Sequence, residues 1–185
     1  MSDSALLVLD MQNDLVTGQH AGDMRMENTI TAIADLIAWA RSREIPIVYS
    51  EVCYRPDYVD AHPDSPSRTR YTMVQGTPGS KTIDRLAPGP KDYVIMKRRT
   101  GAFHGTDLEL VLNGLGARTL LFTGTSTGRA VESTVRAAHD RDFRCIVVSD
   151  ACYARSEELH QAALLCMGDW FAQIKSAAEV KAELA

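Results

Sequence analysis

Two ionisable residues each follow a short apolar run, and a third apolar run leads into a turn of small residues. Asp10 follows residues 5–9, Lys97 follows residues 93–96, and the turn is Gly124-Thr-Ser-Thr-Gly128. Short apolar runs are typical of buried parallel strands, whose carboxyl ends meet at one edge of a sheet. We therefore expect a carboxylate, an ammonium and the N-terminus of a helix to lie together at that edge.

A carboxylate and an ammonium in such a place can form a proton-transfer pair, because each group shifts the pKa of the other. The same two residues also fit a purely structural ion pair, or an aspartate that caps the loop after the first strand. The spacing of Asp10 and Lys97 leaves these readings open.

Around these residues, apolar runs alternate with segments of helical periodicity. Strands are expected at residues 5–9, 46–50, 93–96, 119–123, 144–149 and 171–174, and helices at residues 27–43, 107–115, 129–141 and 157–167. Ser176 is expected to cap a short terminal helix. Such alternation predicts a single α/β domain over residues 1–185, with a doubly wound parallel sheet between two layers of helices.

Two segments lack this regularity. A loop containing Gly18 and Gly22 is expected after Asp10. Residues 53–90 carry six prolines and are expected to form a long loop with one short helix near residues 81–86. A loop of this length inside one domain is usually functional, so we expect a lid or a surface excursion.

Composition excludes several classes of protein. The chain has 185 residues, 45% of them hydrophobic, and a net charge of −4, so no basic surface for nucleic acid is expected. No apolar run approaches the roughly 20 residues that span a bilayer. The start of the chain lacks the features of a signal peptide. The four cysteines have no metal-binding spacing, which favours free thiols in a reducing cytoplasm.

Three separated motifs resemble the isochorismatase-like hydrolases, also called cysteine hydrolases. They are Leu7-Val-Leu-Asp10-Met-Gln-Asn-Asp-Leu15, Val94-Ile-Met-Lys97 with Phe103-x-x-Thr106-x-Leu108, and Gly124-x-x-Thr127 with Asp150-Ala151. The resemblance implies a Rossmann-like sheet of six parallel strands and hydrolysis of a small amide, ureide or vinyl ether. In covalent members the aspartate is the base, a cysteine is the nucleophile and the lysine supports both. Asp10 and Lys97 match the first and last of these.

The cysteine is missing. The family pattern Gly-x-x-Thr-x-x-Cys-Val places Ala130 where the nucleophile would stand. A methyl group cannot attack a carbonyl, so thiol catalysis is not available. Three explanations for Ala130 stay open. It is a substitution introduced to trap a substrate, or the chain is a natural member that works without covalent catalysis, or it is a binding protein that has lost turnover. The neighbouring Gly128 and Arg129 favour natural divergence over a single introduced change.

The resemblance also implies the surroundings of the site. Backbone N–H groups of Ser126 and Ala130 are expected to form an oxyanion hole, and the Thr125–Ser126 peptide is expected to be cis. The substrate is expected to contact Gln12, Arg70, Tyr71 and Phe103, with Phe103 as an apolar wall and an arginine holding a carboxylate or ureide. Arg98 could also line the pocket, although a solvated loop is the preferred reading for Arg98 and Arg99. The family usually forms dimers or tetramers, so a homo-oligomer is expected.

A second enzyme class competes for the same turn. Gly124-Thr-Ser126-Thr-Gly128 matches the nucleophile elbow of α/β-hydrolases, and Asp150 and His160 follow in the required order. Against it, His160 lies in a predicted helix, and the motif would leave Asp10 and Lys97 without a role.

No metal and no cofactor are expected. Nicotinamide-hydrolysing relatives carry Asp-x-His and a further histidine after the second strand, whereas the corresponding segment here reads Ser50-Glu-Val-Cys-Tyr-Arg-Pro56, with only His62 beyond it. No pattern for binding a nucleotide is present.

Overall fold

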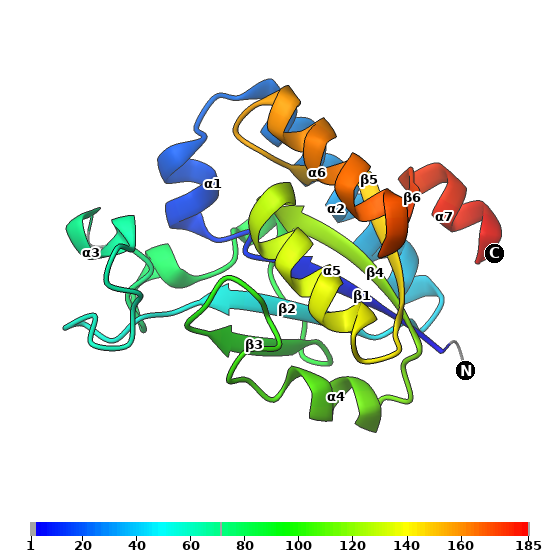
Figure 1. Ribbon diagram of the computed structural model, residues 1–185, viewed down its shortest axis with the longest axis horizontal. Helices are drawn as coiled ribbons and strands as arrows, with labels where there is room; N and C mark the ends of the chain where they lie inside the picture. Colours follow the sequence, from blue (N-terminus) through cyan, green and yellow to red (C-terminus); the bar gives the residue numbers. More distant parts are fainter. Residues whose placement is uncertain (1–2, 71, 185) are drawn as a thin grey trace.

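The computed structural model describes residues 3–70 and 72–184, which fold around one sheet of six parallel strands (Figure 1). The order of the strands is β3-β2-β1-β4-β5-β6, and neighbouring strands run parallel. The strands are β1 (Ser4–Leu9), β2 (Ile47–Val52), β3 (Tyr93–Lys97), β4 (Thr119–Thr125), β5 (Arg144–Tyr153) and β6 (Gln173–Lys175). The predicted doubly wound parallel sheet is confirmed.

Helices cover both faces of this sheet. The helices are α1 (Asn13–Gln19), α2 (Met24–Ser42), α3 (Pro66–Arg70), α4 (Leu108–Gly114), α5 (Glu132–His139), α6 (Glu157–Trp170) and α7 (Ala177–Glu183). Helices α4, α5 and α6 pack on one face, and α2 and α7 pack on the other (Figure 1). Strands β2 and β3 point toward the end of the molecule where α1 and α3 lie, and both chain termini lie at the opposite end.

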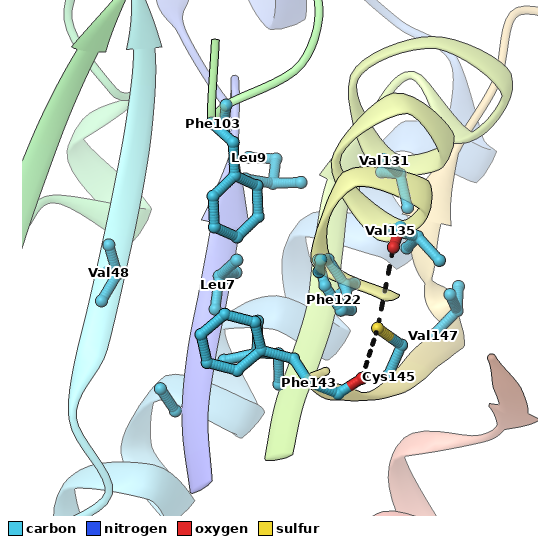
Figure 2. Close-up of a cluster of buried hydrophobic side chains, with 14 of the residues drawn as sticks. Leu7, Leu9, Val48, Phe103, Phe122, Val131, Val135, Phe143, Cys145 and Val147 are labelled. Carbon is cyan, nitrogen blue, oxygen red and sulfur yellow. Dashed lines mark hydrogen bonds between the residues drawn. The ribbon is translucent and has the colours of Figure 1, made fainter. Parts of the chain in front are cut away.

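The two faces follow from the alternation of side chains along each strand. In β1, Leu7 and Leu9 face α4, α5 and α6, whereas Leu6 and Val8 face α2. Every residue of β1 is buried, as expected for a central strand covered on both sides. Figure 2 shows Leu7 and Leu9 beside the ring of Phe103. Each such buried leucine contributes roughly 1.5–3 kcal/mol to the free energy of unfolding.

The segment after Asp10 is a helix, so the expectation of a loop there was wrong. Helix α1 buries Val16, and the side-chain amide of Asn13 donates to the carbonyl groups of Pro78 and Lys81 at 3.0 and 3.2 Å. Gly18 lies inside this helix, and because glycine is a poor helix former, its presence made a loop the expected structure here. Helix α1 therefore depends on contacts with a segment 65 residues away in sequence.

The long proline-containing segment is more ordered than the sequence indicates. It holds α3 and two 3₁₀ helices, η1 (Pro78–Ser80) and η2 (Asp84–Leu86). A small buried cluster joins it to the end of β2 and to α1, formed by Val52, Tyr54, Tyr58, Ala61 and Met73 with Leu15 and Val74 at its edge. Val52 of this cluster ends β2 and pairs with Lys97 at the end of β3.

Strand β5 extends beyond its predicted end at residue 149 because it contains a bulge. Phe122 pairs with Val147 and Gly124 pairs with Cys152, so three additional residues lie on the β5 side. Asp150 lies in this bulge, and its Oδ1 accepts a hydrogen bond from the backbone N–H of Ala177 at the start of α7.

The other differences between the predicted and the observed ends of the elements are small. Ser176 caps α7 as predicted, and Asp107 occupies the cap position of α4.

None of the helices within the described residues is long and apolar enough to cross a membrane. All four cysteines are free, as predicted, and Cys166 alone among them is exposed.

Candidate active site

Asp10 and Lys97 meet at the carboxyl edge of the sheet. Asp10 directly follows β1, and Lys97 ends β3, two strands away. The Nζ atom of Lys97 lies 2.8 Å from Oδ2 of Asp10, and both residues are buried, with 1% and 3% of their surfaces exposed. The predicted contact between the two side chains is confirmed.

Lys97 uses all of its hydrogen-bonding capacity. Besides Asp10, its ammonium donates to the backbone carbonyl of Thr100 at 2.6 Å and to that of Arg99 at 3.2 Å. An ammonium has three N–H donors, so each of them has a partner. The hydrogen bonds within the protein therefore leave no N–H group of this ammonium for a bound molecule.

The carboxylate of Asp10 is held from both sides. Ser50, on the neighbouring strand β2, donates from Oγ to Oδ1 of Asp10 at 2.6 Å, while Oδ2 faces Lys97. Burial raises the pKa of Asp10 above its ordinary value of 3.8, although Lys97 and Ser50 oppose this effect. A carboxyl group with a raised pKa retains a proton at higher pH and is suited to proton transfer. Sequence reasoning missed Ser50, whose one signal is its place at the predicted end of the second strand.

The end of β4 lies very close to the end of β1, just before Asp10. Gly124 has φ +117°, and a Cβ atom placed on it would lie 2.1 Å from the carbonyl oxygen of Leu9, the residue before Asp10. Only glycine permits this approach of the two strands. The peptide between Thr125 and Ser126 is cis, as predicted.

Ala130 lies in the short helical segment η3 (Thr127–Val131) that follows this turn, and it is 3% exposed. Its carbonyl accepts a hydrogen bond from Oγ1 of Thr134 at 2.6 Å, and the same Oγ1 accepts from the backbone N–H of Ala102 at 3.1 Å. Thr134 thus links the segment holding Ala130 to the segment that follows Lys97. The oxyanion hole expected from Ser126 and Ala130 stays a prediction.

Gln12 is buried among backbone groups of the protein itself. Its side-chain amide donates to the carbonyls of Val52 at 2.8 Å and Ser80 at 2.7 Å, and its oxygen accepts from the N–H of Val52 at 2.9 Å. Both of its N–H donors are used, so these contacts favour a structural role instead of the predicted contact with substrate. Gln12 joins β2 to the segment around η1.

The other predicted substrate contacts are spread out. Phe103 packs in the core, with its ring centroid 6.1 Å from that of Phe143 and the guanidinium of Arg141 4.9 Å from its own centroid. Arg70 is exposed at the end of α3, and Tyr71 lies outside the described residues. Arg98 forms a 2.7 Å ion pair with Asp60. A role of Arg70, Tyr71 or Phe103 in binding substrate therefore stays a prediction.

The contacts around His160 do not build the alternative site at Ser126. Nδ1 of His160 lies 2.9 Å from Oγ1 of Thr127, the residue after Ser126. Asp150 is engaged with the start of α7. A groove of about 710 Å³ lies between α6, β6 and the bulge of β5, and both His160 and Asp150 line it. These contacts join His160 to the structure of the turn and give Ser126 no base.

No group of three or more His, Cys, Asp or Glu side chains suited to a metal ion occurs within residues 3–70 and 72–184. Glu51, in the segment that replaces the metal-binding motif of some relatives, is buried and accepts hydrogen bonds from the N–H and Oγ1 of Thr82 at 2.9 and 3.0 Å. Its carboxylate thus holds the segment before η2.

Known proteins resemble this chain over nearly its whole length. The isochorismatase domain model matches residues 4–179. The chain belongs to the isochorismatase family. A relative named ureidoacrylate amidohydrolase RutB, from Methylorubrum extorquens, is 33% identical over 204 residues, covering 98% of this chain and 82% of the relative.

Solved structures of the family share the same architecture. An isochorismatase family protein from Desulfovibrio vulgaris superposes with a TM-score of 0.91 at 28% identity, covering 100% of this chain and 99% of that one. N-carbamoylsarcosine amidase from Thermoplasma acidophilum gives a TM-score of 0.80 at 27% identity, covering 94% and 96%. The family and the fold implied by the three sequence motifs are confirmed, and the chain is an isochorismatase-family hydrolase by descent.

Proposed function

We propose that this protein hydrolyses a small amide, ureide or vinyl ether without a covalent intermediate, with Asp10 transferring the proton and water replacing the missing thiol. The observation that carries the proposal is the buried contact between Asp10 and Lys97. Taking two charged groups out of water is costly unless they are paired, and such pairs concentrate at functional sites.

For an amide or ureide, Asp10 in its ionised form accepts a proton from water while the water oxygen attacks the carbonyl carbon. The charge that develops on the carbonyl oxygen would be stabilised by the N–H groups of Ser126 and Ala130. The proton then passes from Asp10 to the leaving nitrogen as the C–N bond breaks. The names of two relatives, ureidoacrylate amidohydrolase and N-carbamoylsarcosine amidase, support this bond type.

For a vinyl ether, Asp10 in its protonated form donates to the terminal carbon, and the positive charge moves to the ether-bearing carbon. Water adds to that carbon and loses a proton, which returns Asp10 to its starting state. The resulting hemiketal splits into a ketone and an alcohol. The raised pKa of Asp10 supports this role as an acid.

In both reactions, Lys97 stabilises the ionised form of Asp10 at a fixed distance. Its three N–H groups stay on Asp10, Arg99 and Thr100. The reacting proton is therefore carried by Asp10 alone.

The second candidate is a protein that binds a small molecule and has lost turnover. Ala130 favours it, because the methyl group at the position of the nucleophile cannot form the acyl intermediate. The two candidates predict the same contacts with a ligand but differ in product formation.

The test is an assay of the purified protein on an N-carbamoyl amino acid, a primary amide and a vinyl ether of a 2-hydroxyacrylate, with Asp10→Asn as the matched control. Ammonia or ketone release that Asp10→Asn reduces by about 100-fold or more supports hydrolysis. Calorimetric binding without product supports the second candidate. Product formation that is unaffected by Asp10→Asn would overturn the proposed role of Asp10.

A further inference from the structure

The hydroxyl of Thr134 lies between the two segments that shape the candidate site. Thr134 is in the first turn of α5 and is fully buried. Its Oγ1 donates to the carbonyl of Ala130 and accepts from the N–H of Ala102. One side chain therefore fixes the distance between the segment holding Ala130 and the segment that follows β3.

The segment that follows β3 also holds the ammonium of Lys97. The carbonyls of Thr100 and Arg99 accept two of its three hydrogen bonds, and Asp10 accepts the third. Because Nζ has no spare donor, the positions of these three acceptors determine where the charge lies.

The same segment packs directly on α5. A Cβ atom placed on Gly101 would lie 3.6 Å from Cβ of Ser133, the residue before Thr134. Thr100 and Ala102 flank Gly101, so the acceptor for Lys97 and the donor to Thr134 are separated by one residue that lies against the helix. A movement of Ala102 away from α5 would therefore move the carbonyl of Thr100.

We propose that Thr134 is a positioning residue, which fixes the ammonium of Lys97 relative to Asp10 and to residue 130 through Ala102 and Thr100. The proposal rests on the proposed function for its importance in catalysis. Removing the hydroxyl would leave the buried N–H of Ala102 without its partner, and this penalty favours displacement of the segment. The hydroxyl-bearing variant Thr134→Ser keeps both hydrogen bonds.

The experiment compares Thr134→Val with Thr134→Ser in the otherwise unchanged protein without substrate. The readout is the titration of the Asp10 carboxyl, followed by NMR in protein with ¹³C-labelled aspartate and assigned with Asp10→Asn. The charged groups near this carboxyl are Lys97 and Glu51, and neither is altered by the substitutions.

In Thr134→Val, the displaced ammonium should stabilise ionised Asp10 less, so the titration should move to higher pH by about half a unit or more. Thr134→Ser should titrate like the parent. Crystal structures of both variants give a second measurement, the distance from Nζ of Lys97 to Oδ2 of Asp10. If Thr134→Val does not fold, Thr134→Ala removes the hydroxyl without adding a methyl group and serves the same purpose.

A residue that only stabilises the fold would lower the melting temperature in the valine or alanine variant and leave the Asp10 titration and the Nζ position unchanged. That result would overturn the proposal. Because both measurements are made without substrate, a protein that proves inactive would sink the proposed function and leave this test intact.

Discussion

The ammonium of Lys97 lies 2.8 Å from the carboxylate of Asp10, and both side chains are buried, with 0% and 5% of their surfaces exposed. The two residues are far apart in sequence and are brought together because β1 and β3 end at the same edge of the sheet. Interactions between charges in such surroundings are stronger than at a surface and are less screened by salt.

Lys97→Met should reduce the free energy of unfolding by about 3–5 kcal/mol at pH 8, because it leaves the buried carboxylate without its partner. The loss should become smaller as the pH is lowered towards the raised pKa of Asp10, because a protonated carboxyl group is neutral. Urea denaturation over a series of pH values measures this.

The double variant Asp10→Asn/Lys97→Met is the control for that prediction. It removes both charges, so it should be more stable than Lys97→Met alone at pH 8. Additive losses from the two substitutions would show that the groups do not interact.

Asp10 should also make stability depend on pH. Its pKa is higher in the folded protein than the ordinary value of 3.8, so between the two values the folded state binds more protons than the unfolded state. The resulting stabilisation is fully present below the ordinary value and is lost as the pH rises through the folded value. Asp10→Asn should remove this decline, which is measured as the difference between the two unfolding free energies across pH. A difference that does not change with pH would contradict the raised pKa.

Gly124→Ala should destabilise the protein by about 3 kcal/mol or more, because the added Cβ would meet the backbone of Leu9 and the φ of +117° is unfavourable for alanine. The melting temperature should fall by roughly 6–12 °C. Gly114→Ala is a matched control, since Gly114 ends α4 and nothing lies within 4 Å of its added Cβ. That variant should be neutral or slightly more stable. Equal effects of the two substitutions would refute the close approach at Gly124.

Ala130→Cys should create a thiol with a pKa well below the free value of about 8.5, because the charge of Lys97 and the start of a helix stabilise a thiolate. The measurement is the rate of alkylation against pH. Lys97→Met and Asp10→Asn in the same background should slow the reaction, since they remove the positive charge and the proton acceptor. An introduced thiol that reacts like a free one would show that this turn is not built for a nucleophile.

The unmodified protein supplies the background for that experiment. Burial raises the pKa of Cys53 and raises that of Cys145 to about 12, and Cys152 is buried as well. Cys166 is exposed, so native protein should be alkylated rapidly at one site, detected by peptide mass spectrometry. Cys166→Ser should abolish this reaction and provides the parent for the Ala130→Cys series. Rapid labelling of Cys53 in native protein would contradict its burial.

The sequence predicts the sheet, the pairing of Asp10 with Lys97 and the cis peptide, because these depend on local patterns or on motifs shared by the family. It does not predict α1, whose position depends on hydrogen bonds from Asn13 to a distant segment. The sequence also predicts a contact between Gln12 and the substrate. It cannot show that the side-chain amide of Gln12 binds backbone groups of Val52 and Ser80, because these partners approach Gln12 only in the folded chain. Nothing in the sequence around Thr134 predicts a place near the site, because its hydrogen bond with Ala102 forms only in the folded chain.

The saturated ammonium of Lys97 limits how many protons the pair can handle. With three N–H groups on three fixed acceptors, Lys97 cannot lose or lend a proton without breaking a buried hydrogen bond. Any reaction cycle at this edge of the sheet must therefore return one proton to one carboxyl oxygen of Asp10 before the next molecule is processed.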